Sequence, residues 1–164
     1  MRVCINIDNG TSGSISILSK DLSICEFFQT PKKMEQSYTK KKQNISRIDY
    51  NVLYAKLKPY CKDAIAVLER PLVQPSLFRA TLSAMRAFEA TTIALEQLGI
   101  GIQVEDSKKW QKEMLPQGLK GSTELKKASK DIGIRLFPQH KAMITKQKDA
   151  DALLMGEYWR RNKL

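Results

Sequence analysis

The chain has 164 residues, 42% of them hydrophobic and 27% charged, so it is long enough to bury the core of one domain. Its net charge of +11 and isoelectric point near 9.6 indicate a polyanionic partner such as nucleic acid. No apolar run reaches the roughly 18 residues that a membrane span needs, and the chain begins with strand-like sequence. We therefore expect a cytoplasmic protein with no membrane segment and no secretory signal.

The cysteines and the histidine limit the chemistry further. Three cysteines, widely spaced and odd in number, indicate reduced thiols, with Cys4 and Cys25 on strands and Cys61 at a helix end. No Cys or His cluster has the spacing of a zinc site. Nucleophilic catalysis would depend on His140 alone, so we disfavour it.

The N-terminal third predicts an antiparallel meander followed by a basic loop. Three short strands are expected at about 2–8, 13–19 and 22–28. Gly10-Thr11-Ser12-Gly13 forms the first turn and Lys20-Asp21 the second. Strands in immediate succession pair in antiparallel fashion. The lysine-rich residues 29–48 are expected to be a loop.

The remainder alternates helices and strands. Asp49 is the predicted N-cap of a helix to about Tyr60, and Ser76 that of a long helix ending at Gly99. Buried strands are expected at 64–69 and 101–104. Further helices are expected at about 108–115, 122–132 and 149–161, the second capped by Ser122 or Thr123.

This order predicts an α/β fold: a single domain over residues 1–164 with a mixed five-stranded sheet flanked by helices. The first and fourth strands would lie side by side as parallel neighbours. Asp8 and Glu69, which close these two strands, would then emerge together at one sheet edge, where open α/β sheets carry their active sites.

Four carboxylates are candidate metal ligands: Asp8, Glu69, Asp149 and Asp151. An unpaired carboxylate at the end of a buried strand is costly, whereas Mg²⁺ prefers oxygen ligands of this kind. Two such ions about 4 Å apart can activate water and stabilise the leaving oxygen of a phosphodiester. A structural alternative stays open, in which Asp8 caps its turn and Glu69 pairs with Arg70 or another surface base.

Several segments, in their order and spacing, resemble the RuvC-type Holliday junction resolvases of the ribonuclease H-like superfamily. The likeness is greatest to versions carried by phages of low-GC Gram-positive bacteria. These segments are Ile5-Asn6-Ile7-Asp8-Asn9-Gly10, Val67-Leu68-Glu69-Arg70-Pro71, Lys109-Trp110-Gln111-Lys112, Lys126-Lys127-Ala128-Ser129 followed by Leu136-Phe137-Pro138, and Asp149-Ala150-Asp151-Ala152-Leu153.

The resemblance implies a Mg²⁺-dependent endonuclease, with Mn²⁺ as a substitute, that acts as a homodimer on four-way DNA junctions and leaves 5′-phosphates. It implies Asp8, Glu69 and Asp151 as metal ligands. The family usually has Asp or His three residues before the last of these, where this chain has Lys148. Asp149 can help if it lies outside the helix; otherwise Lys148 reaches the scissile phosphate.

The basic residues are concentrated in two windows. Residues 29–48 contain six Lys or Arg and one acidic residue, and residues 108–130 contain seven Lys and two Glu. This favours a phosphate-binding footprint over a merely solvated surface. The candidate DNA-binding residues are Lys32, Lys33, Lys40, Lys41, Lys42, Arg79, Arg86, Lys109, Lys112, Lys126 and Lys127.

Two aromatic residues and the long helix have two interpretations each. We expect Trp110 to anchor its helix in the core rather than stack on bases, and Phe78 to pack rather than wedge into a junction. The small residues Ala84, Ala87 and Ala94 allow either close packing on the sheet or a dimer interface.

Other functions remain as alternatives. One is a ribonuclease H-like hydrolase of RNA–DNA hybrids, and another is a junction-binding protein without catalysis. The run Asp8-Asn9-Gly10-Thr11-Ser12 is also similar to the phosphate-binding loop of actin-like ATPases and sugar kinases. We disfavour that function because those proteins need two lobes to enclose a nucleotide.

Overall fold

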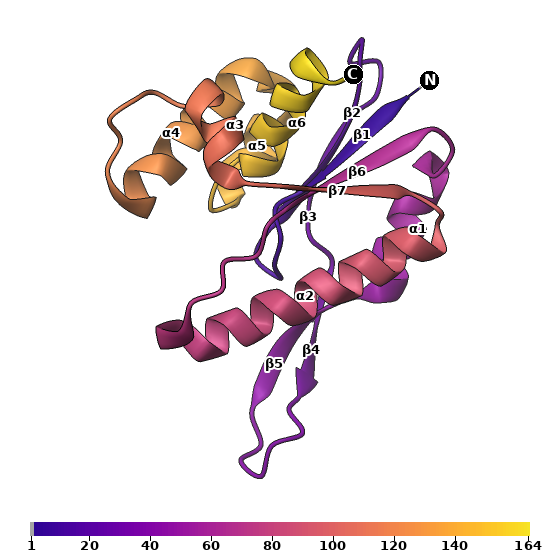
Figure 1. The fold of residues 1–164 in the computed structure, drawn as a ribbon, viewed down its shortest axis with the longest axis vertical. Helices are drawn as coiled ribbons and strands as arrows, with labels where there is room; N and C mark the ends of the chain where they lie inside the picture. Colours follow the sequence, from indigo (N-terminus) through magenta and orange to yellow (C-terminus); the bar gives the residue numbers. More distant parts are fainter. Residues whose placement is uncertain (1) are drawn as a thin grey trace.

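The fold is built around a mixed five-stranded sheet, seen in a computed structural model that describes residues 2–164. The strands of the sheet lie in the order β3-β2-β1-β6-β7 (Figure 1). Their bounds are Val3–Ile7 for β1, Ser14–Ser19 for β2, Cys25–Gln29 for β3, Ala64–Glu69 for β6 and Gly101–Glu105 for β7. The predicted fold class is therefore confirmed, including the pairing of the first and fourth predicted strands.

The register of the sheet explains how two candidate residues meet. Strands β1, β2 and β3 form the antiparallel meander, while β1 and β6 run parallel with Ile7 opposite Leu68. Strand β7 continues the parallel part beside β6. Asp8 and Glu69 each follow directly after this last pair, so they leave the sheet at the same edge.

Helices cover both faces of the sheet (Figure 1). Their bounds are Tyr50–Leu57 for α1, Phe78–Gln97 for α2, Ser107–Met114 for α3, Gly121–Leu136 for α4, Lys141–Lys146 for α5 and Asp151–Asn162 for α6. Side chains alternate across a strand, so Ile5 faces α1 and α2 while Cys4 faces α3 and α6. Within residues 2–164, no helix combines the length and apolarity that a bilayer span requires.

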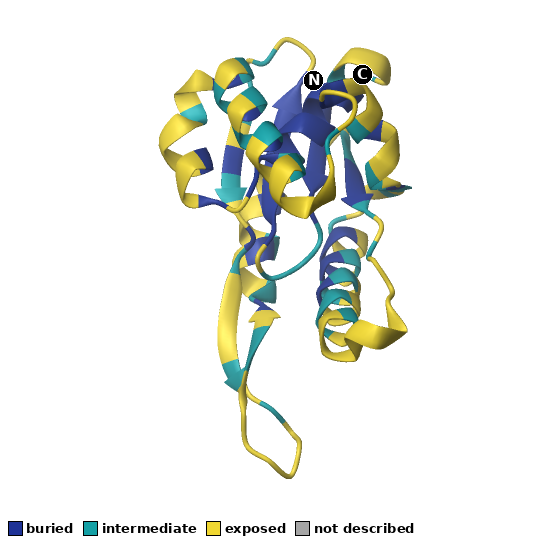
Figure 2. Cartoon of the chain, turned by 90° about the vertical axis from the view of Figure 1, so that its left-hand side faces the viewer, coloured by how far each residue is buried: buried dark blue, intermediate teal, exposed yellow. Residues whose placement is uncertain are grey.

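Residues 29–48 correct the prediction of a basic loop. They form a two-stranded antiparallel hairpin, with β4 at Lys32–Gln36 and β5 at Asn44–Ile48. Glu35 holds the hairpin across its strands, because its carboxylate pairs with Lys33 and Arg47, each at 2.6 Å. The hairpin extends away from the sheet and is mostly exposed (Figure 2). Only Ile48, at the base of the hairpin, is buried in the core, so most of its two strands lack the alternation of polar and apolar residues that marks a strand.

Helix boundaries were predicted unevenly. Asp49 caps α1 as expected, accepting a hydrogen bond from the Val52 N–H at 3.2 Å. The Ser76 prediction was wrong, because a 3-10 turn occupies Pro75–Leu77 and α2 begins at Phe78 without a side-chain cap. The caps predicted for the helix at 122–132 were wrong too: α4 begins at Gly121 and runs to Leu136.

Three smaller differences concern turns between elements. Strand β3 begins at Cys25 rather than at 22, because the Asp21 side chain accepts a hydrogen bond from the Ser23 N–H within the turn. Helix α5 at Lys141–Lys146 was not predicted. The last helix begins at Asp151 rather than at 149, which leaves Asp149 outside it.

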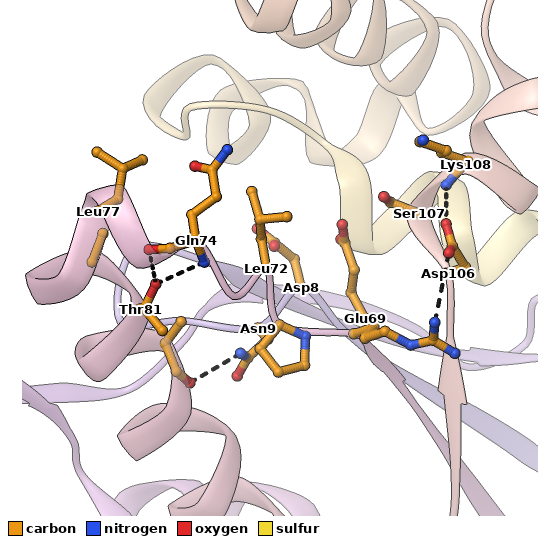
Figure 3. A pocket seen from close by; sticks show the side chains of 14 residues that line it. Asp8, Asn9, Glu69, Leu72, Gln74, Leu77, Thr81, Asp106, Ser107 and Lys108 are labelled. Atoms are coloured by element: carbon orange, nitrogen blue, oxygen red, sulfur yellow. Dashed lines mark hydrogen bonds and ion pairs between the residues drawn. The ribbon is translucent and has the colours of Figure 1, made fainter.

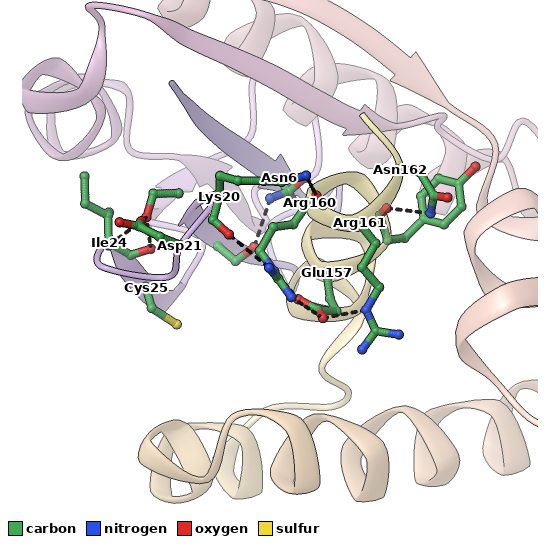
Figure 4. A network of polar contacts seen from close by, with 12 residues as sticks. Asn6, Lys20, Asp21, Ile24, Cys25, Glu157, Arg160, Arg161 and Asn162 are labelled. Carbon is green, nitrogen blue, oxygen red and sulfur yellow. Dashed lines mark hydrogen bonds and ion pairs between the residues drawn. The ribbon is translucent and has the colours of Figure 1, made fainter. Parts of the chain in front are cut away.

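A buried polar network fastens α6 to the sheet. Ser16 on β2 accepts a hydrogen bond from the Asn6 amide and donates one to the Ala152 carbonyl at 2.7 Å. Gly156 permits this contact, since a Cβ there would lie 2.6 Å from the Asn6 side-chain nitrogen. Near the other end of α6, the buried Glu157 accepts bonds from the Arg160 and Arg161 side chains (Figure 4). The Ser16 contact places the start of α6, and hence Asp151, against the sheet, and Arg160 near the other end donates to the Lys20 carbonyl after β2 at 2.9 Å.

Candidate metal and nucleic-acid site

Asp8 is positioned by a tight turn between β1 and β2. Its backbone N–H donates to the Ser14 carbonyl at 3.0 Å, which continues the ladder past the end of β1. Gly13 lies directly against it, because a Cβ at Gly13 would come within 2.0 Å of the Asp8 carbonyl oxygen. The Asp8 side chain is 6% exposed at the sheet edge.

Asp149 and Asp151 approach the same edge from the other helical layer. Residues i and i+2 on a helix point in nearly opposite directions, but Asp149 precedes α6, so this rule does not separate its carboxylate from that of Asp151. The Oδ1 atom of Asp149 accepts a hydrogen bond from the Asp151 N–H at 3.3 Å. Asp151 opens the helix, and its Oδ1 accepts the Ser129 hydroxyl at 2.5 Å. Lys130 holds the preceding loop through the carbonyls of Thr145 and Gln147.

The carboxylates form one electrostatic cluster. Burial, opposed by the charge of Lys148 and assisted by that of Asp149, raises the pKa of Asp8 to about 6. Burial, and then the charges of Asp8 and Asp151, raise the pKa of Glu69 to about 8. Burial and the neighbouring Asp149 raise the pKa of Asp151 to about 7. Each group therefore disfavours ionisation of the others, which is the condition that a bound cation relieves.

Lys148 is the cation nearest these carboxylates. Its Nζ lies 3.1 Å from Oδ2 of Asp8 and 3.7 Å from Oδ2 of Asp149. Burial works against its charge, but the two carboxylates raise the pKa of Lys148 above its ordinary value. Its side chain is 35% exposed, so the ammonium also faces solvent. Lys148 therefore lies among the acidic residues, and its contact with a scissile phosphate stays a prediction.

Glu69 does not form the ion pair with Arg70 that the structural alternative expected. Arg70 pairs with Asp106 at 3.8 Å rather than with Glu69. The Oε2 atom of Glu69 is buried and has no hydrogen-bond partner among residues 2–164. An orphaned carboxylate oxygen of this kind fits a hard cation that prefers oxygen ligands.

The acidic side chains do not surround one common point at which an ion could bind. Among the described residues, no three Asp, Glu, His or Cys side chains are gathered tightly enough to enclose a metal ion as they stand. The donor chemistry fits Mg²⁺, but the side chains have to turn toward an ion to bind it.

A cleft of about 540 Å³ opens beside the carboxylates. Asp8, Glu69 and Asp106, at the ends of three adjacent strands, lie along one wall of it (Figure 3). The segment before α2 and the first turns of that helix form the opposite wall, which includes Leu77 and Thr81. The cleft gives an extended ligand access to the sheet edge.

Three of the candidate DNA-binding residues line a second groove. This groove measures about 590 Å³ and lies between the hairpin and the first half of α2. Arg79 and Arg86 line it together with Lys41, so the two arginines share one face of the helix. Lys33 and Arg47 are partly neutralised by Glu35, whereas Lys40, Lys41 and Lys42 are exposed at the hairpin tip.

The remaining basic candidates lie on α3 and α4. Lys109 pairs with Glu105 at 3.2 Å, while Lys112 and Lys127 are exposed. Lys126 is exposed as well, and its charge lowers the pKa of Asp8, which places it on the side of the acidic cluster. Lys32 at the start of β4 is exposed too.

The structure places five residues that had alternative interpretations. Trp110 is fully buried, so it is a core anchor as expected. Phe78 is 67% exposed, and the expectation that it packs was wrong, because the first half of α2 extends beyond the sheet. Ala87 and Ala94 are buried in the core. Ala84 is half-buried, and its carbonyl accepts the Asn9 side-chain amide.

The residue His140 lies away from the cluster. Its Nε2 is 3.0 Å from the Cys25 carbonyl on β3. Cys25 pairs with Leu18 on β2, and Leu18 pairs with the first half of β1, whereas Asp8 follows the last residue of that strand. The cysteines are free, with Cys4 and Cys25 on strands and Cys61 after a 3-10 turn, as predicted.

Sequence reasoning missed Ser129 and Lys130 as supports of the site, although both are polar residues on the face of α4 that packs near α6.

Comparison with known proteins identifies the fold. No family model and no curated protein sequence matches the chain. A structure of RuvC from Thermus thermophilus aligns with a TM-score of 0.51 at 10% identity, over 97% of this chain and 95% of that one. T. thermophilus RuvC in complex with a Holliday junction substrate aligns with a TM-score of 0.49 at 10% identity, over 80% and 79%. The chain has a RuvC-like fold.

Proposed function

We propose that this protein is a Mg²⁺-dependent endonuclease that cuts branched DNA, chiefly four-way junctions. The observation that carries the proposal is the cluster of buried carboxylates at the ends of β1 and β6, on a RuvC-like fold with a net charge of +11. An acidic centre in a basic body suits a metal-assisted reaction on a polyanion. The three free cysteines suit a cytoplasmic protein.

The proposed ligands are Asp8, Glu69 and Asp151, with Asp149 in support. Mg²⁺ bound there, or Mn²⁺ in its place, would polarise the scissile phosphate and lower the pKa of an attacking water. Ser129 orients Asp151, and the Asp8 turn holds its carboxylate at the sheet edge. Lys126 and Lys148 place positive charge beside the phosphate. Hydrolysis in this arrangement leaves a 5′-phosphate and a 3′-hydroxyl.

Two symmetric cuts require two sites, so we propose a homodimer. The first half of α2 and the turn before it support this proposal, because four large apolar side chains there are exposed. They are Leu77, Phe78, Leu82 and Met85. A second copy packed against them would cover this surface and bring the two basic hairpins to one side of the assembly.

The test is cleavage of a labelled four-way junction in Mg²⁺, with linear duplex, fork and RNA–DNA hybrid as comparisons. We expect paired nicks across the branch point and little cutting of the other substrates. In Asp8→Asn we expect cutting to fall by at least about 10³-fold with junction binding retained, as for other residues that stabilise a transition state.

Two outcomes would contradict the proposal. Preferential cutting of the hybrid would instead indicate a ribonuclease H-like activity. Tight junction binding without cutting in either Mg²⁺ or Mn²⁺, unchanged by Asp8→Asn, would indicate a binding protein. Salt dependence does not separate these cases, because counterion release weakens all three complexes as salt rises.

A further inference from the structure

The oxygens of the acidic cluster are not equally available to a metal. Asp149 has both of its oxygens engaged: Oδ1 accepts the Asp151 N–H and Oδ2 lies 3.7 Å from the Lys148 ammonium. The buried Oδ2 of Asp8 accepts no hydrogen bond from residues 2–164, but it forms an ion pair with the same ammonium at 3.1 Å. Asp151 has Oδ1 engaged by the Ser129 hydroxyl.

Three acidic side chains therefore keep oxygens open within residues 2–164. Asp8 offers Oδ1, Asp151 offers Oδ2, and Glu69 offers a carboxylate whose buried Oε2 has no hydrogen-bond partner. Mg²⁺ in proteins is held by a few carboxylate oxygens and keeps several waters for its other positions. The open oxygens thus match the needs of one ion.

A second ion would need carboxylate oxygens beyond those that the acidic side chains leave open. Two ions in such a site lie about 3.5–4 Å apart and share a ligand, so a bridging carboxylate gives one oxygen to each. Asp8 closes β1 between the other acidic residues and is the natural bridge, but its Oδ2 is already paired with Lys148. With Mg–O contacts of about 2.1 Å, a second ion on that oxygen would lie within about 5 Å of an ammonium that repels it.

We propose that this site takes one divalent cation and that the ammonium of Lys148 fills the place of a second. The inference rests on the proposed function and refines the expectation of two ions. Lys148 is well suited to the role, because its side chain is 35% exposed and its charge reaches the solvent side of the carboxylates. There it meets the scissile phosphate as a hydrogen-bond donor that needs no metal.

The experiment counts bound ions directly. Purified protein is titrated with Mn²⁺, and free Mn²⁺ is followed by its electron paramagnetic resonance signal. We expect one ion per chain in the wild type, after subtraction of the ions that an Asp8→Asn, Asp151→Asn variant binds at its surface. In Lys148→Met, which removes the charge and shortens the side chain by only one atom, we expect two ions and a spin-coupled signal from the pair.

Lys146→Met is the matched control, because Lys146 is an exposed lysine at the end of α5, two residues from Lys148 in the sequence. This variant should bind one ion, as the wild type does. Thermal unfolding with and without Mn²⁺ shows whether each variant is folded when it is counted. Lys148→Gln serves as a second neutral variant, with the same expected count of two.

The failures are distinguishable. Two ions in the wild type would overturn the inference while leaving a metal-dependent nuclease intact. One ion in both the wild type and the folded Lys148 variants would also overturn it, because Lys148 would then not decide the count. No specific ion in the wild type, together with no cutting of any branched DNA, would overturn the proposed function itself.

Discussion

The hydroxyl of Ser129 on α4 donates a hydrogen bond to Oδ1 of Asp151 at the start of α6, at 2.5 Å. The same hydroxyl accepts the Ala150 N–H at 3.1 Å, so one buried side chain fixes both the carboxylate and the backbone that leads into it. Helix α4 supplies no carboxylate to the acidic cluster. Its Ser129 nevertheless sets the orientation of the Asp151 side chain, which is a candidate metal ligand.

Replacing Ser129 should therefore weaken metal binding as well as stability. In Ser129→Ala the Ala150 N–H loses its buried acceptor, which we expect to cost about 1–3 kcal/mol of unfolding free energy. The affinity for Mn²⁺ should fall too, because Asp151 is no longer held. Urea unfolding and Mn²⁺ titration measure the two effects. Ser122→Ala, at an exposed position on the same helix, should change neither; equal losses in both variants would contradict the role of Ser129.

Gly13 should be intolerant of any side chain. A Cβ there would lie 2.0 Å from the Asp8 carbonyl oxygen, so Gly13→Ala has to displace the turn that carries Asp8. We expect a loss of about 1–3 kcal/mol, as for other overpacked sites, and a strong loss of junction cutting. Gly101→Ala is the control, because nothing lies within 4 Å of a Cβ at that position. Denaturant midpoints and cleavage rates that are unaffected in Gly13→Ala would show that the turn does not position Asp8.

Without metal, the protein should lose stability as the pH rises from about 5 to 8. Folding raises the pKa of Asp8 to about 6, of Asp151 to about 7 and of Glu69 to about 8, so the folded state binds more protons than the unfolded chain in this window. Stability falls with pH wherever that holds. The carboxylates with lowered pKa, Asp21, Glu35 and Glu157, titrate below the window.

Urea unfolding in EDTA at pH 5, 6, 7 and 8 measures this dependence. Asp8→Asn combined with Glu69→Gln should flatten it, because two of the three groups are then neutral at every pH. Saturating Mg²⁺ should reverse its direction, since metal binding favours the deprotonated carboxylates. A stability that rises with pH in EDTA would contradict the acidic cluster as described.

The tip of the hairpin should contribute phosphate contacts. Replacing Lys40, Lys41 and Lys42 with alanine should weaken junction binding and reduce the slope of log Kd against log salt by about 2–3, given about 0.9 per lost contact. Alanine at Lys58, Lys62 and Lys163 is the matched control, since these exposed lysines follow α1 or end the chain, away from the acidic edge. Equal salt slopes for the two triple variants would argue against a hairpin footprint.

The exposed half of α2 should mediate self-association. Phe78→Asp and Leu82→Glu place charges on the apolar surface, so sedimentation equilibrium should show monomers for these variants and the proposed dimer for the wild type. Because both side chains are exposed, the melting temperature of the monomer should change little. Wild-type protein that is monomeric at micromolar concentrations would contradict the dimer, and so would variants that remain dimeric.

The amino-acid sequence by itself determined most of the sheet and the candidate ligands. Apolar runs predicted β1, β2 and β6, and Asp49 predicted the start of α1, because burial pattern and capping are local properties of the chain. The parallel pairing of β1 with β6 followed from the order of the elements, and it brought Asp8 beside Glu69 without any side-chain coordinates. The β4–β5 hairpin escaped prediction because only Ile48 at its base is buried, so most of its residues face no core that would select an apolar face.

Only the tertiary structure decided how the acidic residues are held and what they face. Ser129 and Asp151 are 22 residues apart, and Lys148 meets Asp8 from the opposite end of the chain, so neither contact leaves a local pattern to read. The direction of Asp149 depended on where α6 begins, which is set by packing of that helix on Ser16 and Asn6. Side-chain contacts between distant segments arise from the packing of whole elements, and that packing determines which carboxylate oxygens stay open.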